Sequence, residues 1–104
     1  MRTMIDYEQK ITFLVGRYGE EHQLIQTAEE AAELSHAAIK RHGALTDGNA
    51  SADRLSLTRG ALLEEIADVL IMIDQIMYAE GFTDNDVRTI AGEKLTRQIG
   101  RAGK

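Results

Sequence analysis

Residues 61–80 read ALLEEIADVLIMIDQIMYAE, and Gly81 follows them directly. Asp68 is the only polar residue between Ile66 and Ile73, a run of more than two helical turns. A helix that is apolar all the way round is buried on every side. We therefore expect a helix from about Leu57 to Glu80, with Asp68 facing the interior or a closed cleft. A buried carboxylate requires a proton, a cationic partner or a metal ion.

The rest of the chain also predicts helices. It contains no proline and only 5% aromatic residues, and it is rich in good helix formers. Three more helices are expected, over about Asp6–Arg17, Glu20–Arg41 and Thr83–Arg101, with Gly19 and Gly43 ending the first two. The segment from His42 to Ser56 is predicted to be a mobile connection. The fold class is therefore all-α, in a single domain spanning residues 1–104.

Composition excludes several classes of protein. The chain has 104 residues, a formal charge of −5 and no cysteine, so zinc–thiolate sites, disulfides and a cysteine nucleophile are excluded. The acidic balance argues against a nucleic-acid partner and against an anionic membrane surface. Neither a secretory signal nor a membrane-spanning stretch is evident, which favours a cytoplasmic protein.

Two sets of carboxylates occupy matching positions on the two longest predicted helices. The second helix carries Glu-x-x-Glu and the third carries Glu-x-x-Asp, and each motif places its two acids on one helical face. If the helices pack antiparallel, four carboxylates converge, and two such charges about 4 Å apart repel by roughly 4 kcal/mol at an effective dielectric of 20. All-oxygen ligands suit Mg²⁺, with Mn²⁺ as a substitute. The four candidate metal ligands are Glu30, Glu33, Glu65 and Asp68.

These motifs resemble those of the MazG-like nucleoside triphosphate pyrophosphohydrolases. The matching segments are Glu29-Glu30-Ala-Ala-Glu33-Leu and Glu64-Glu65-Ile-Ala-Asp68-Val-Leu-Ile-Met. The resemblance implies a subunit of four antiparallel helices that self-associates as a dimer or tetramer. It also implies Mg²⁺-dependent cleavage of nucleoside triphosphates to monophosphate and pyrophosphate, as nucleotide-pool house-cleaning.

The other expected site residues surround these motifs. Glu29 or Glu64 would orient the attacking water or support a metal ligand. Gln23 and Gln26 are candidates for contacting the base. On the last helix Lys94, Arg97 and Arg101 share a face that suits phosphate oxygens, although cations near a helix C-terminus also complement its dipole.

Other interpretations remain open at the level of sequence. Glu33-Leu-Ser-His36 has the Glu-x-x-His spacing of di-iron helical bundles, which a homodimer would duplicate. A non-catalytic helical oligomerisation module is a second alternative. Asp68 in an apolar run is also compatible with a buried ion pair to an arginine such as Arg59.

Overall fold

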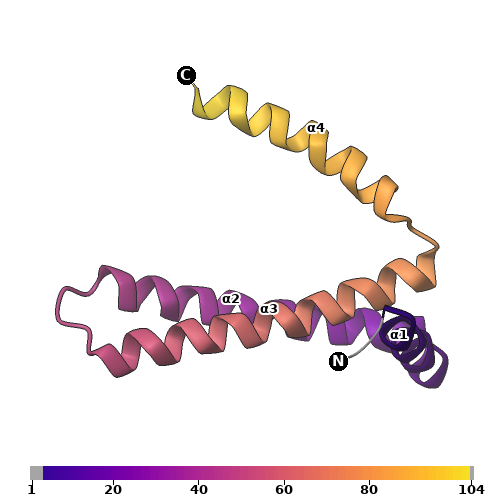
Figure 1. The fold of residues 1–104 in the computed structure, drawn as a ribbon, viewed down its shortest axis with the longest axis horizontal. Coiled ribbons are helices and arrows are strands. Elements are labelled where there is room, and N and C mark those ends of the chain that lie inside the picture. The colour runs from indigo at the N-terminus through magenta and orange to yellow at the C-terminus, as the bar shows by residue number, and fades with distance from the viewer. Residues whose placement is uncertain (1–3, 104) are drawn as a thin grey trace.

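The structure, a computed structural model, describes residues 4–103, and at its centre two long helices form an antiparallel hairpin. Helix α2 spans Glu20–Thr46 and helix α3 spans Ala52–Glu80. Figure 1 shows the two helices lying side by side along the length of the hairpin. Only residues 47–51 connect them, so the connection predicted over His42–Ser56 is wrong at both of its ends.

Helix α2 runs through Gly43, where the sequence predicted it to end. Ala44 is 1% exposed, so the next turn is held in contact with α3. A Cβ atom at Gly43 would lie 3.2 Å from Nη2 of Arg54, so a side chain here would displace the tip of that guanidinium. The guanidinium of Arg41 also donates to the carbonyl oxygen of Leu55 at 2.8 Å. These tertiary contacts continue the helix past a residue that usually ends one.

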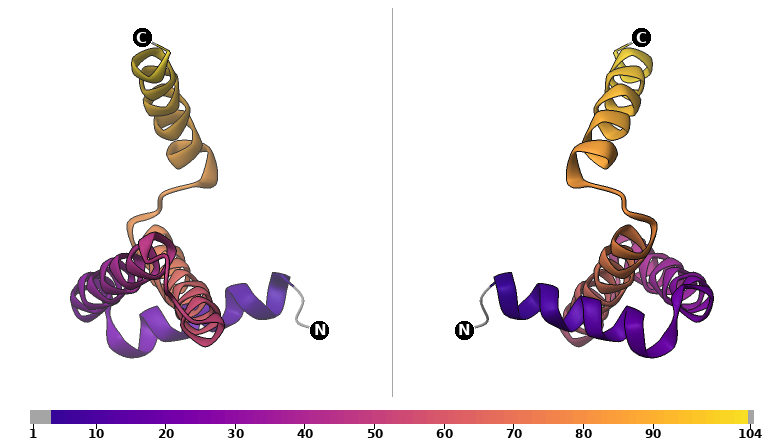
Figure 2. Two further views of the ribbon diagram at one scale, coloured as in Figure 1. Left: turned by 90° about the vertical axis from the view of Figure 1, so that its left-hand side faces the viewer. Right: turned by 90° about the vertical axis from the view of Figure 1, so that its right-hand side faces the viewer.

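Helix α1, Met4–Tyr18, crosses one end of the hairpin (Figure 2). Gly19 ends it with φ of +85°, a conformation that residues with a side chain rarely adopt. Ile11 is buried, and the hydroxyl of Tyr7 donates a hydrogen bond to Asp74 of α3. Burial and this bond to a carboxylate raise the pKa of Tyr7 to about 12. Helix α1 therefore closes the open end of the hairpin.

Helix α4, Asp84–Ala102, leaves the hairpin after Gly81, whose φ is +75°. Thr83 and Asp86 form a capping box: Asp86 N donates to Thr83 Oγ1 at 3.1 Å, and Thr83 N donates to Asp86 Oδ2 at 2.8 Å. These bonds lower the pKa of Asp86. Within residues 4–103, α4 contacts none of the other three helices, and Figure 1 shows it diverging from the hairpin.

The prediction of an all-α chain with four helices is confirmed, and residues 4–103 contain no strand. No helix in that part of the chain combines the length and apolarity that a membrane crossing requires. The predicted burial of Ile66–Ile73 on every side is wrong, because only Met72 of that run is buried and Asp68 is exposed. The position of α4 leaves Ile66, Leu70 and Ile73 uncovered on the outer side of α3.

Candidate metal centre

A buried hydrogen bond between two glutamines sets the register of α2 against α3. Gln23 Nε2 donates to Gln75 Oε1 at 2.6 Å, and these residues are 5% and 1% exposed. In an antiparallel pair, each step forward on α2 corresponds to one step back on α3. Counting ten residues from the glutamines places Glu33 opposite Glu65.

The register brings carboxylates of the two predicted motifs together. Single ligand oxygens of Glu30, Glu33 and Glu65 all lie within 4.8 Å of one another. Glu30 and Glu65 are half-buried, and each shields one Oε2 atom from solvent with no hydrogen-bond partner. A shielded carboxylate oxygen without a partner is costly, and a cation would satisfy it. We call these three residues the acidic cluster.

The negative charges of the acidic cluster lie close together, and they raise the pKa of two of its members. Desolvation is the largest cause that raises the pKa of Glu30 and of Glu65, and the charges of Glu33 and Asp68 raise both further. Asp68 is exposed and lies outside the tightest group of oxygens, but its charge acts on the same site. Among residues 4–103, neither Asp68 nor any member of the acidic cluster forms an ion pair. The predicted alternative in which Asp68 pairs with Arg59 is therefore not realised in this chain.

The donor set fits a hard divalent cation. All of the converging atoms are carboxylate oxygens, which Mg²⁺ and Mn²⁺ prefer. His36 is exposed, and it is not among the converging ligands found in the described part of the chain. A single chain therefore presents a cluster of carboxylates, and the Glu-x-x-His set of the di-iron alternative is not assembled in it.

The glutamines predicted to contact a substrate differ in their surroundings. The side-chain amide of Gln23 already has two hydrogen-bond partners, because its Nε2 donates to Gln75 and its Oε1 accepts from His22 Nδ1 at 2.7 Å. A nucleotide would reach it only by breaking this buried pair, and the contact stays a prediction. Gln26 is half-buried one turn before Glu30, on the side of α2 that carries the acidic cluster.

The two carboxylates predicted to orient water are both exposed and both adjoin the acidic cluster in sequence. The negative charge of Glu64 is the smallest of the causes that raise the pKa of its neighbour Glu65. The catalytic roles of Glu29 and Glu64 stay predictions.

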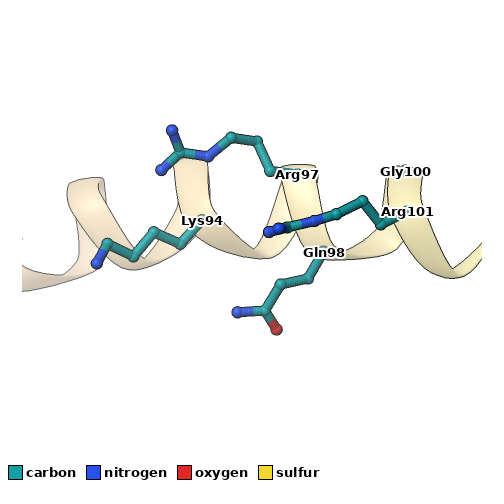
Figure 3. Close-up of a pocket in the computed structure, with 5 residues that line it drawn as sticks. All are labelled: Lys94, Arg97, Gln98, Gly100 and Arg101. Carbon is teal, nitrogen blue, oxygen red and sulfur yellow. The ribbon is translucent and has the colours of Figure 1, made fainter.

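The predicted phosphate-binding cations lie on α4, away from the acidic cluster. Lys94, Arg97 and Arg101 help to line a pocket whose lining comes from α4 alone, and Figure 3 shows their side chains along this helix. None of the three forms an ion pair within residues 4–103. In a single chain, α4 does not bring these cations to the carboxylates.

A cavity next to the acidic cluster escaped the sequence reasoning. It has a volume of about 630 Å³ and lies between α2 and α3, and Ala37, Lys40, Leu57 and Ala61 are among its lining residues. Ala37 follows Glu33 by one turn and Ala61 precedes Glu65 by one turn, so the cavity begins about one helical turn from the acidic cluster. Lys40 is a candidate substrate-binding residue that the sequence analysis missed. It lies seven residues after Glu33 on the same helix, and this spacing puts both residues on one face.

No protein-family model, no curated protein and no solved structure matches the chain. The resemblance drawn from the carboxylate motifs accordingly stays a prediction.

Proposed function

We propose that the chain is a Mg²⁺-dependent nucleoside triphosphate pyrophosphohydrolase of the MazG-like type, acting as a homo-oligomer in the cytoplasm. The convergence of Glu30, Glu33 and Glu65 within 4.8 Å carries the proposal, because three carboxylates with two unpartnered shielded oxygens form a site for a hard cation. A cation bound there would offset the charge of a triphosphate and lower the pKa of a coordinated water.

The reaction is hydrolysis of the bond between the α- and β-phosphates. A water oxygen bonds to the α-phosphorus and the water loses a proton to the solvent, while the bond from that phosphorus to the bridging oxygen breaks and pyrophosphate leaves. Glu29 or Glu64, both exposed beside the metal ligands, would orient the water. The neighbouring cavity, which Ala37, Lys40, Leu57 and Ala61 help to line, would offer room for the nucleoside.

A product analysis tests this proposal. Purified protein is incubated with each common and each oxidised or deaminated nucleoside triphosphate in Mg²⁺, and the products are resolved by ion-exchange chromatography. Monophosphate and pyrophosphate are expected in equal amounts. In water enriched in ¹⁸O, the label should appear in the monophosphate, because the α-phosphorus is attacked.

A matched pair of variants ties the activity to the acidic cluster. Glu65→Gln keeps the side-chain volume and removes one ligand charge, so turnover should fall by about 10²-fold or more. Glu93→Gln makes the same change at an exposed position on α4 and should leave turnover unchanged. Diphosphate as the main product, or equal activity of the two variants, would overturn the proposal.

A further inference from the structure

Another cavity, with a volume of about 410 Å³, lies where α1 crosses the C-terminal part of α3 (Figure 2). Its walls come from α1, from α3 and from the segment that leads into α4. Three of its lining residues in the described part of the chain are aromatic, three are acidic, and none is lysine, arginine or histidine. We call it the α1 cavity. The aromatic residues are Tyr7, Tyr78 and Phe82, and the acidic residues are Glu8, Asp74 and Asp84.

Two of the aromatic rings are open to solvent and are not packed in a core. Tyr78 is 55% exposed and Phe82 is 52% exposed. Phe82 N donates to Met77 O at 2.9 Å, and this bond fixes the backbone turn that carries the second ring past the end of α3. The face of an aromatic ring carries partial negative charge and attracts cations. The open rings therefore favour a positively charged ligand.

The third ring is held by a hydrogen bond to one of the carboxylates. The hydroxyl of Tyr7 donates to Asp74 Oδ2. Burial and the bond to Asp74 raise the pKa of Tyr7 to about 12, so this ring stays uncharged at physiological pH. Asp74 Oδ1 forms no hydrogen bond or ion pair with another residue among 4–103. Asp74 therefore keeps one oxygen for a ligand while the other orients Tyr7.

The carboxylates of the α1 cavity have no cation of the protein's own. Within residues 4–103, none of Glu8, Asp74 and Asp84 forms an ion pair. Nor do these three converge as metal ligands, because the acidic cluster is the one group of acids in the described chain whose ligand oxygens meet within 4.8 Å. A metal ion needs several oxygens at about 2.0–2.6 Å. Carboxylates spread around a cavity suit a larger cation instead.

The α1 cavity is separate from the acidic cluster. Asp74 follows Glu65 by nine residues on α3, which places it about 13.5 Å further along the helix and about 180° around it. A ligand in the α1 cavity would therefore lie on the opposite side of α3 from the candidate metal centre.

We propose that the α1 cavity binds a small organic cation that carries an alkylated ammonium group. The three aromatic rings would contact the alkyl groups on the nitrogen, and the carboxylates would lie around its positive charge. A neutral ligand would leave these carboxylates without a counter-charge, and an anion would be repelled by them. The inference does not depend on the proposed hydrolysis, and its test uses neither metal nor nucleotide.

Calorimetric titration of the full chain with choline tests the proposal. Choline should bind saturably, with a dissociation constant of about 1 mM or lower. Its neutral isostere 3,3-dimethylbutan-1-ol, in which carbon replaces the ammonium nitrogen, should bind at least about tenfold more weakly. In proton NMR, the N-methyl signal of choline should move upfield on binding, because the methyl groups would lie over ring faces. No saturable binding of choline, or equal affinity for the two compounds, overturns the proposal.

The two phenylalanines of the chain provide a matched pair of variants. Phe82→Leu keeps an apolar side chain but removes a ring of the α1 cavity, so it should weaken choline binding by about threefold or more. Phe13→Leu makes the same change at a residue of α1 that is 66% exposed and does not line the cavity, and it should leave the affinity unchanged. Equal affinities of the two variants overturn the proposal.

A pair of charge variants applies even if Phe82→Leu does not fold. Asp84→Asn removes one carboxylate of the α1 cavity and should weaken choline binding by about twofold or more. Asp53→Asn is the control, since Asp53 is also exposed in the first turn of a helix but does not line the α1 cavity. Choline bound at the acidic cluster instead would be insensitive to Asp84→Asn, and that result overturns the proposal.

Discussion

Gln23 of α2 donates its side-chain amide to Gln75 of α3 at 2.6 Å, and this buried bond lies ten residues along each helix from the facing pair Glu33 and Glu65. One polar contact thus selects the register that assembles the acidic cluster. A shift by one residue would turn the facing positions by about 100° and separate the carboxylates.

Replacing Gln23 should destabilise the protein. Gln23→Ala leaves Gln75 Oε1 buried without a donor, which should cost about 1–3 kcal/mol of unfolding free energy in urea denaturation. The control is Gln98→Ala on the exposed surface of α4, for which a change within about 0.5 kcal/mol is expected. Equal effects of the two substitutions would show that the glutamine pair does not fix the register.

Stabilisation by Mg²⁺ should depend on pH. The raised pKa of Glu30 and of Glu65 means that the folded chain binds their protons more tightly than the unfolded chain does. Above the raised pKa, ionisation of these two carboxyl groups lowers the stability of the metal-free protein. This loss of stability becomes smaller as the pH falls toward 4.5, the pKa of the same groups in the unfolded chain. Mg²⁺ should therefore raise the melting temperature more at about pH 8 than at about pH 5, where protons compete for the same oxygens. A shift independent of pH would contradict this.

Asp68→Asn should separate stability from metal affinity. Asp68 has no cationic partner among residues 4–103 and adds to the repulsion on Glu30 and Glu65. In EDTA, the melting temperature of the variant should therefore equal or exceed that of the wild type. With Mg²⁺ its turnover should fall by about 10²-fold or more. A large loss of stability in EDTA with activity retained would show that Asp68 has a structural role instead.

Two glycine-to-alanine substitutions should change the stability of the protein in opposite directions. Gly81 ends α3 with φ of +75°, so Gly81→Ala should cost about 1–2 kcal/mol. Gly92 lies inside α4 with open space where a Cβ would be, so Gly92→Ala should stabilise the protein by up to about 1 kcal/mol. Thermal unfolding of both variants checks the pair, and destabilisation by Gly92→Ala would contradict the helical conformation assigned to this residue.

Local signals in the sequence predict most of the helix ends. The glycines at 19 and 81 and the Thr83–Asp86 capping box lie where the structure has them, because each acts through its own backbone. Gly43 does not end α2 as the sequence predicts, since Ala44 is buried and Arg41 donates to Leu55 O across the hairpin. Local sequence patterns do not predict tertiary contacts of this kind.

The sequence predicts the convergence of three of the four candidate carboxylates, and it does not predict that Asp68 is exposed. Glu30, Glu33 and Glu65 converge because helical spacing puts each motif on one face. The apolar surroundings of Asp68 predicted burial, but periodicity does not reveal which molecule covers each side of a helix. The direction of α4, which decides where Lys94 and Arg97 lie, depends on backbone angles at residues 81–83 that residue types do not specify.

Titration with Mn²⁺, followed by electron paramagnetic resonance of the free ion, tests most directly whether the acidic cluster binds a metal. The wild type and Glu93→Gln should bind Mn²⁺ saturably and with equal affinity, and Mg²⁺ should compete. Glu65→Gln should weaken binding by about tenfold or more, because it removes one of the three converging carboxylates. Equal Mn²⁺ affinity of all three proteins, or no saturable binding to the wild type, would contradict the assignment of Glu30, Glu33 and Glu65 as a metal centre.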